Sequence, residues 1–230
     1  MIPWLLLDTA SVPGGGELRL WRRGSEFSIR LGPSELMSSR VSGSEQALAS
    51  ITCGLIKTRK RPTILIGGLG MGFTLRAALA ALGADAEVVV AELVPTVVAW
   101  ARGPMAEMFG TSLTDPRVTI READVGDLVR SGRSRFDAII LDVDNGPQGL
   151  TRTANDALYD AAGLNAARAA LRPGGILALW SSGPDPAFTQ RLRRAGFDVD
   201  ERSVRANGAR GGARHVIWIA TRRAMRTRAG

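Results

Sequence analysis

The chain has 230 residues, of which 45% are hydrophobic, and its 30 basic and 22 acidic side chains give a formal net charge of +8. With one cysteine, Cys53, and one histidine, His215, the composition excludes disulfide frameworks, Cys/His zinc sites and nucleophilic systems that need a second imidazole or thiol. The sequence has no apolar run long enough to span a membrane and no cationic segment at its start, so it predicts a soluble, cytoplasmic protein.

The positive charge lies at the C-terminal end of the chain. Residues 1–190 hold 19 basic and 19 acidic side chains, whereas residues 191–230 hold eleven arginines and three acidic residues. The chain has 28 arginines and only 2 lysines, and no aromatic-basic stacking motif accompanies the tail, so nucleic acid is not the expected partner. The alternative is a non-catalytic or RNA-directed binding protein that uses this Arg-rich end, and its binding would weaken steeply with salt.

The first part of the chain, residues 1–42, is predicted to form a small antiparallel β-hairpin unit. Alternating apolar and polar residues at 17–22 and 26–31 flank a short turn, which is the pattern of two paired strands. Residues 43–61 are predicted to be a linking helix, capped by Ser44, and a basic linker.

Residues 62–222 alternate between short apolar strands and helices, and residues 223–230 are expected to form a flexible basic tail. Continuous apolar strands of this kind are typical of a parallel sheet that is covered on both faces. The predicted fold is α/β: a doubly wound, mostly parallel seven-stranded sheet that closes with an antiparallel C-terminal hairpin. The predicted strands are residues 63–66, 87–91, 117–121, 136–141, 176–180, 197–204 and 215–220.

A glycine-rich loop, with the sequence IGGLGMG over residues 66–72, follows the first of these strands and opens a helix. Its backbone amides can approach an anionic or electron-rich ligand at the helix N-terminus. Glu92 ends the second strand, where a carboxylate can accept both hydroxyls of a ribose. The dinucleotide-binding pattern is incomplete, because Phe73 stands where a third Gly or Ala belongs.

Asp124 ends the segment Arg-Glu-Ala-Asp that follows the third strand. A carboxylate at this place can meet the amino group of an adenine, and it can also cap the helix that is predicted at residues 125–130. The two roles are compatible, and both stay open at this point.

Taken in order, these motifs resemble those of a known family. The glycine loop, Glu92, Asp124, the segment FDAIILD ending in Asp142 and the segment LRPGG at residues 171–175 are similar to class I S-adenosylmethionine-dependent methyltransferases, which are Rossmann-like, over about residues 62–222. Within that superfamily the chain is most similar to the spermidine synthases, the polyamine aminopropyltransferases. These also carry an N-terminal hairpin unit and an Asp-rich loop after the fourth strand. The resemblance implies S-adenosylmethionine or decarboxylated S-adenosylmethionine as the cofactor, and a homodimer.

The resemblance also implies a role for each site residue. Asp142 and Asp144 belong to a shortened version of the Asp-rich loop and are the predicted catalytic residues, of which Asp142 also contacts the cofactor. Such a carboxylate can accept a proton from an attacking amine or hold a cationic substrate, and the alternative is that both residues only shape the loop. The expected cofactor-binding residues besides Asp142 are Gly67, Gly68, Leu69, Gly70 and Gly72 for the methionine part, Glu92 and Leu93 for the ribose, and Asp124 for the adenine. No metal site is expected.

Two departures from the spermidine synthase pattern bear on the substrate. The synthases pair an Asp of the glycine loop with the free ammonium of decarboxylated S-adenosylmethionine, and Gly70 stands at that position here. They also hold the polyamine with a Tyr-His-Glu segment, whose nearest counterpart is Gly-Ser-Glu-Gln at residues 43–46. The favoured hypothesis is an enzyme, an S-adenosylmethionine-dependent transferase that transfers a methyl or aminopropyl group to an amine or cationic small molecule. The alternative is a true polyamine aminopropyltransferase.

Other conspicuous residues are predicted to be structural. Cys53 lies in an apolar helix and is expected in the core, and His215 is expected to be structural or exposed. Trp180 ends the fifth strand and can line either the core or the acceptor pocket.

Overall fold

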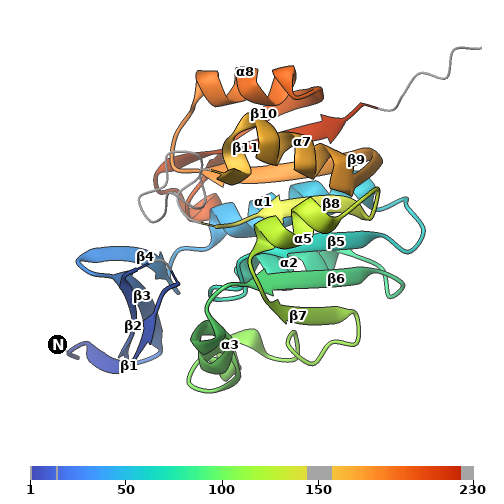
Figure 1. The fold of residues 1–230 in the computed structure, drawn as a ribbon. Helices are drawn as coiled ribbons and strands as arrows, with labels where there is room; N and C mark the ends of the chain where they lie inside the picture. The colour runs from blue at the N-terminus through green and yellow to red at the C-terminus, as the bar shows by residue number, and fades with distance from the viewer. Residues whose placement is uncertain (1, 14, 144–156, 224–230) are drawn as a thin grey trace, which may run out of the picture.

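The computed structural model describes residues 2–13, 15–143 and 157–223 (Figure 1). The predicted basic tail, residues 223–230, lies outside them except for Arg223. Within the described residues no helix is long and apolar enough to cross a membrane.

The centre of the molecule is a seven-stranded sheet in the order β10-β11-β9-β8-β5-β6-β7. The strands from β9 to β7 are paired in parallel, and β11 runs antiparallel to both β9 and β10. The predicted α/β fold, a mostly parallel seven-stranded sheet with an antiparallel closing hairpin, is therefore confirmed. The strands are β5 (Thr63–Gly67), β6 (Glu87–Glu92), β7 (Val118–Glu122), β8 (Phe136–Leu141), β9 (Leu171–Ser181), β10 (Phe197–Arg205) and β11 (Arg214–Arg222).

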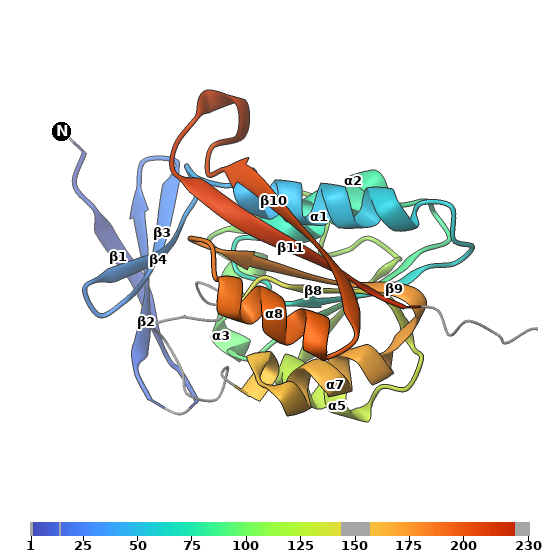
Figure 2. The same cartoon turned by 90° about the horizontal axis from the view of Figure 1, so that it is seen from above.

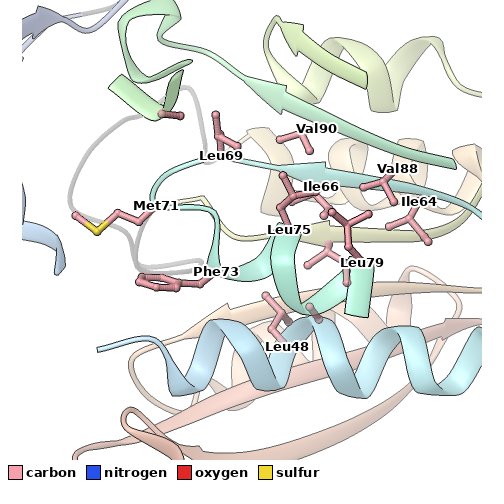
Figure 3. Packing of buried hydrophobic residues seen from close by; sticks show 14 of the residues in the cluster. Leu48, Ile64, Ile66, Leu69, Met71, Phe73, Leu75, Leu79, Val88 and Val90 are labelled. Atoms are coloured by element: carbon pink, nitrogen blue, oxygen red, sulfur yellow. The ribbon is translucent and has the colours of Figure 1, made fainter. Parts of the chain in front are cut away.

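Helices cover both faces of this sheet, as Figure 2 shows, with α1 and α2 on one face and α5, α7 and α8 on the other. Side chains of a strand point alternately to its two faces. In β5, Ile64 and Ile66 therefore join the cluster under α1 and α2 (Figure 3), whereas Leu65 joins the cluster under α5 and α7. The helices are α1 (Gly43–Ile56), α2 (Phe73–Ala81), α3 (Pro95–Arg102), α4 (Ala106–Phe109), α5 (Val125–Ser131), α7 (Ala161–Ala170), α8 (Pro186–Arg194) and the 3-10 turn η1 (Gly208–Arg210).

The N-terminal residues form a separate antiparallel sheet of four strands in the order β1-β2-β3-β4. The sequence predicts only the two inner strands, because β1 is mostly exposed and does not alternate, and β4 is short. The indole N–H of Trp100 in α3 donates to Asp8 of β1 at 2.7 Å, which ties this sheet to the central domain. The strands are β1 (Leu5–Ser11), β2 (Glu17–Arg23), β3 (Glu26–Leu31) and β4 (Ser34–Ser38).

The predicted basic linker is anchored by one buried carboxylate. Asp137 in β8, whose side chain is 3% exposed, forms salt bridges with Arg59 at 2.6 Å and Arg172 at 2.5 Å. It also accepts the backbone N–H of Thr63 at 2.8 Å. Its two oxygens therefore bind the linker, the start of β5 and the start of β9 together at the amino end of the sheet.

Candidate functional site

A cavity of about 210 Å³ lies where the parallel strands end, between the central sheet and the N-terminal sheet. One side is formed by residues that end or follow β5 to β8, because the carboxyl ends of parallel strands meet at the same edge of a sheet. The N-terminal sheet lies beside that edge in both views (Figures 1 and 2). Its contribution to the cavity is apolar and consists mainly of Leu18, Ile29, Leu31, Leu36 and Met37.

The structure brings most of the predicted site residues together in this cavity. Those that line it are Gly68, Gly70, Glu92, Leu93, Asp124 and Asp142. The remaining predicted loop residues do not line the cavity: Gly67, Leu69 and Gly72. The second predicted catalytic residue, Asp144, lies outside the described residues.

The glycine loop needs its glycines. Gly68 has a φ of +88°, and a Cβ at this position would lie 2.6 Å from the carbonyl oxygen of Asp142. Gly70 has a φ of +49°, and its Cβ would lie 2.5 Å from the methyl carbon of Met37. Both positions combine a backbone conformation that favours glycine with a close approach, so the loop passes tightly between the end of β8 and the N-terminal sheet.

Glu92 fastens this loop. Its Oε2 accepts the N–H of Leu69 at 2.9 Å, and its Oε1 accepts the N–H of Val94 at 2.9 Å. Burial raises the pKa of the Glu92 carboxyl, while the backbone N–H groups oppose that rise because they favour the charged form. Glu92 therefore holds the loop in place, and it also lines the cavity.

Asp124 is the N-cap of α5 and accepts the N–H of Gly126 at 2.7 Å. The capping role is therefore confirmed. The same residue lines the cavity, so the geometry leaves it free for the second predicted role, a contact with an adenine.

Asp142 lies next to another carboxylate, that of Glu45. Burial raises the pKa of the Asp142 carboxyl to about 7, the negative charge of Glu45 adds to the rise, and a hydrogen bond from Thr74 opposes it. The Thr74 hydroxyl donates to Asp142 Oδ2 at 2.5 Å. Because Thr74 is the second residue of α2, the turn of the glycine loop also sets the position of this hydroxyl.

Glu45 is the site residue that sequence reasoning missed. The sequence predicts Ser44 as the cap of the linking helix, but α1 begins at Gly43 with Ser42 at the N-cap position. Glu45 lies in the first turn of α1 and lines the cavity. The signal that could have found it is its match to the Glu of the Tyr-His-Glu segment.

The cavity combines two features with a clear chemical meaning. Of the described residues that line it, the titratable ones are Glu45, Glu92, Asp124 and Asp142, and none is Lys, Arg or His. The site therefore favours a cation on its acidic side and an apolar group on the side of the N-terminal sheet. Within the described residues there is no group of three or more His, Cys, Asp or Glu side chains that could hold a metal ion.

Comparison with known proteins identifies the fold. No family model matches the sequence, and no match was found among curated proteins. A spermidine synthase solved in complex with the transition-state analogue AdoDATO superposes with a TM-score of 0.72 at 19% identity, covering 94% of this chain and 72% of that one. Spermidine synthase from Thermotoga maritima gives the same TM-score and coverage at 18% identity.

A solved methyltransferase-fold structure outside the spermidine synthases supports the same assignment. TrmN from Thermus thermophilus has a TM-score of 0.54 at 26% identity, covering 77% of this chain and 48% of that one. The chain therefore has a spermidine synthase-like, class I methyltransferase fold, as the resemblance of its motifs implied.

Proposed function

We propose that this chain is an S-adenosylmethionine-dependent transferase that methylates an amine. The observation that carries the proposal is the pairing of Asp142 with Glu45 in the same cavity as the glycine loop, Glu92 and Asp124. The fold shared with spermidine synthases and TrmN supports it, because the cavity lies at the strand ends, where α/β sheets bind ligands.

The residues of the cavity suit the cofactor. The glycine loop would hold the methionine part, Glu92 with Leu93 the ribose, and Asp124 the adenine amino group. S-adenosylmethionine supplies an electrophilic methyl group on a sulfonium, whose thioether leaves without help from an acid. The chain's own residues then have two tasks, which are to orient the amine and to remove its proton.

Asp142 is suited to the second task. An amine attacks only with a free lone pair, so a bound ammonium must first lose a proton. A carboxylate with a pKa of about 7 accepts a proton far more readily than an ordinary aspartate does, and Asp142 gains this property from burial and from Glu45.

The glycine at position 70 favours intact over decarboxylated S-adenosylmethionine. The spermidine synthases carry an Asp at this position, and here any side chain would have to displace the flexible end of Met37. A loop without a carboxylate suits a cofactor that keeps its own carboxylate, since two neighbouring carboxylates would repel each other.

Calorimetric titration with the two cofactors tests the proposal. We expect intact S-adenosylmethionine to bind more tightly than the decarboxylated form, and methylated product to form with at least one member of a panel of butylamine, benzylamine and putrescine. Tighter binding of the decarboxylated form would instead identify an aminopropyltransferase, and binding of neither would overturn the proposal.

A further inference from the structure

Two partly buried hydrogen bonds link Glu45 through Ser44 to His215. The Ser44 hydroxyl donates to Glu45 Oε2 at 2.8 Å, and Nδ1 of His215 lies 3.1 Å from the same hydroxyl oxygen. Ser44 is 1% exposed. These bonds join the start of α1 to β11 across 171 residues of sequence, so they depend on the assembled fold.

The number of available protons determines which group donates in each of these hydrogen bonds. A serine hydroxyl has one hydrogen to donate. Since Ser44 donates it to Glu45, it can only accept from His215, and the proton of the neutral imidazole therefore sits on Nδ1. Burial lowers the pKa of His215, which favours this neutral form at pH 7.

Trp180 lies against His215 and also lines the cavity. Its ring lies edge-on to the imidazole of His215, with 4.8 Å between ring centroids. Trp180 and Glu45 line the cavity, whereas Ser44 and His215 do not. In the adjacent strand β10, the residue paired with His215 is Val204. Of the three linked residues, therefore, only Glu45 faces the space that a substrate would enter.

We propose that Ser44 and His215 are positioning residues that hold Glu45 as an anion facing the cavity, so that Glu45 binds the ammonium of the acceptor and Asp142 takes its proton. The inference rests on the proposed function for the identity of the acceptor. The two neighbouring carboxylates then have different roles: Glu45 binds the ammonium and Asp142 accepts the proton.

The surroundings of the two carboxylates differ in the way this division requires. Glu45 is held from behind by Ser44, and that hydrogen bond favours its charged form and opposes the rise that burial causes in its pKa. Asp142 receives a hydrogen bond from Thr74, but it is buried and also feels the charge of Glu45, which together bring its pKa to about 7. The other titratable groups that line the cavity, Glu92 and Asp124, are also acidic. Where the surroundings of two coupled carboxyls move their pKa values apart in this way, one stays charged and the other carries the exchangeable proton.

The first test needs neither cofactor nor acceptor. Because His215 is the only histidine, ¹⁵N-histidine labelling gives a single pair of ring-nitrogen signals in the nuclear magnetic resonance spectrum. We expect the Nδ1–H form in the unmodified chain. In Glu45→Ala the Ser44 hydroxyl is free to donate to Nδ1, and the imidazole should change to the Nε2–H form. An Nε2–H form in the unmodified chain, or no change in Glu45→Ala, would overturn the chain of hydrogen bonds. Glu107→Ala is the control.

The second test uses benzylamine as the probe acceptor with saturating S-adenosylmethionine. His215→Ala should raise the KM for the amine about tenfold, as expected when a charged group loses its supporting hydrogen bond, with little change in kcat or in cofactor affinity. His215→Gln retains an N–H donor and should restore much of the loss. Ser44→Ala breaks the same link to Glu45 and should raise the KM for the amine in the same way. Ser50→Ala, at an exposed position of the same helix, is its matched control and should leave the KM unchanged.

The outcomes separate the two hypotheses. A loss of kcat alone, or an equal loss of cofactor affinity, would show that His215 supports the fold or the cofactor site instead of Glu45. If no amine is methylated, the proposed function fails and the role of Glu45 fails with it, whereas the resonance experiment still decides whether the hydrogen-bonded chain exists.

Discussion

The thioether sulfur of Met37 accepts the backbone N–H of Met71 at 3.1 Å. This contact joins β4 of the N-terminal sheet to the glycine loop of the central domain. It places the methionine side chain beside Gly70, so the N-terminal sheet helps to shape the cavity.

Gly70→Asp alone should therefore not produce a site for decarboxylated S-adenosylmethionine. The new Cβ would lie 2.5 Å from the terminal methyl of Met37 and 2.8 Å from its sulfur, so this flexible side chain would have to move and give up its hydrogen bond from Met71. We therefore expect weaker binding of either cofactor, by up to about tenfold. The double variant Gly70→Asp with Met37→Ala removes the collision and should regain the decarboxylated form preferentially. Titration calorimetry on both variants measures this, with Met37→Ala as the control. Tight binding of the decarboxylated form by the single variant would contradict the steric argument.

Gly68→Ala should destabilise the fold and abolish cofactor binding. The added methyl would lie 2.6 Å from the Asp142 carbonyl oxygen at a positive φ, and we expect a loss of about 2–4 kcal/mol in the free energy of unfolding. Gly110→Ala is a matched control, because Gly110 has a φ of +54° but no atom within 4 Å of its Cβ position. Its cost, about 1–3 kcal/mol, isolates the backbone strain. Equal costs in urea unfolding would show that the collision is absent.

Asp142→Asn should stabilise the free protein at high pH. The pKa of Asp142 is raised from 3.8 to about 7 in the folded state, so the folded state binds this proton more tightly than the unfolded state does. The protein therefore loses stability as the pH rises between these two values. The asparagine cannot ionise, so at pH 8 the variant should be more stable by about 2–4 kcal/mol. At pH 4 this difference should vanish. Urea unfolding at both pH values measures it, and a difference independent of pH would contradict the raised pKa.

Asp137→Ala should lower the free energy of unfolding by about 3 kcal/mol, because it leaves Arg59, Arg172 and the N–H of Thr63 without their shared acceptor. Arg59→Ala and Arg172→Ala should each cost less, since both guanidinium groups are partly exposed and Asp137 keeps the other arginine and the N–H of Thr63. Thermal unfolding of the three variants gives the comparison. If either arginine variant is as damaging as Asp137→Ala, the carboxylate is not the centre of this network.

The sequence predicted the parts of the structure whose signal is local. Strands β5 and β8 are fully buried and read as continuous apolar runs, and the glycine loop and Asp142 stand directly after them. The predictions for Glu92 and Asp124 rested on the same rule, since a residue that follows a parallel strand must reach the common edge.

The contacts that the sequence did not reveal join distant segments. No local pattern connects Ser44 with His215, or Met37 with Met71, because each pair meets only after the sheet and the N-terminal strands have assembled. Strand β1 was missed for a different reason. Its side chains are mostly exposed, so burial imposes no alternation on its sequence.

Strand β8 carries Asp137 near its beginning and leads into Asp142 just beyond its end. At about 3.3 Å per residue, the two aspartates are separated by about 16 Å. Substitutions this far apart, with no shared contacts, usually have additive effects. Substitutions that strengthen the ion pairs around Asp137 would therefore raise the free energy of unfolding and offset the loss caused by substitutions around Asp142. One end of strand β8 can thus be engineered for stability and the other for a new acceptor.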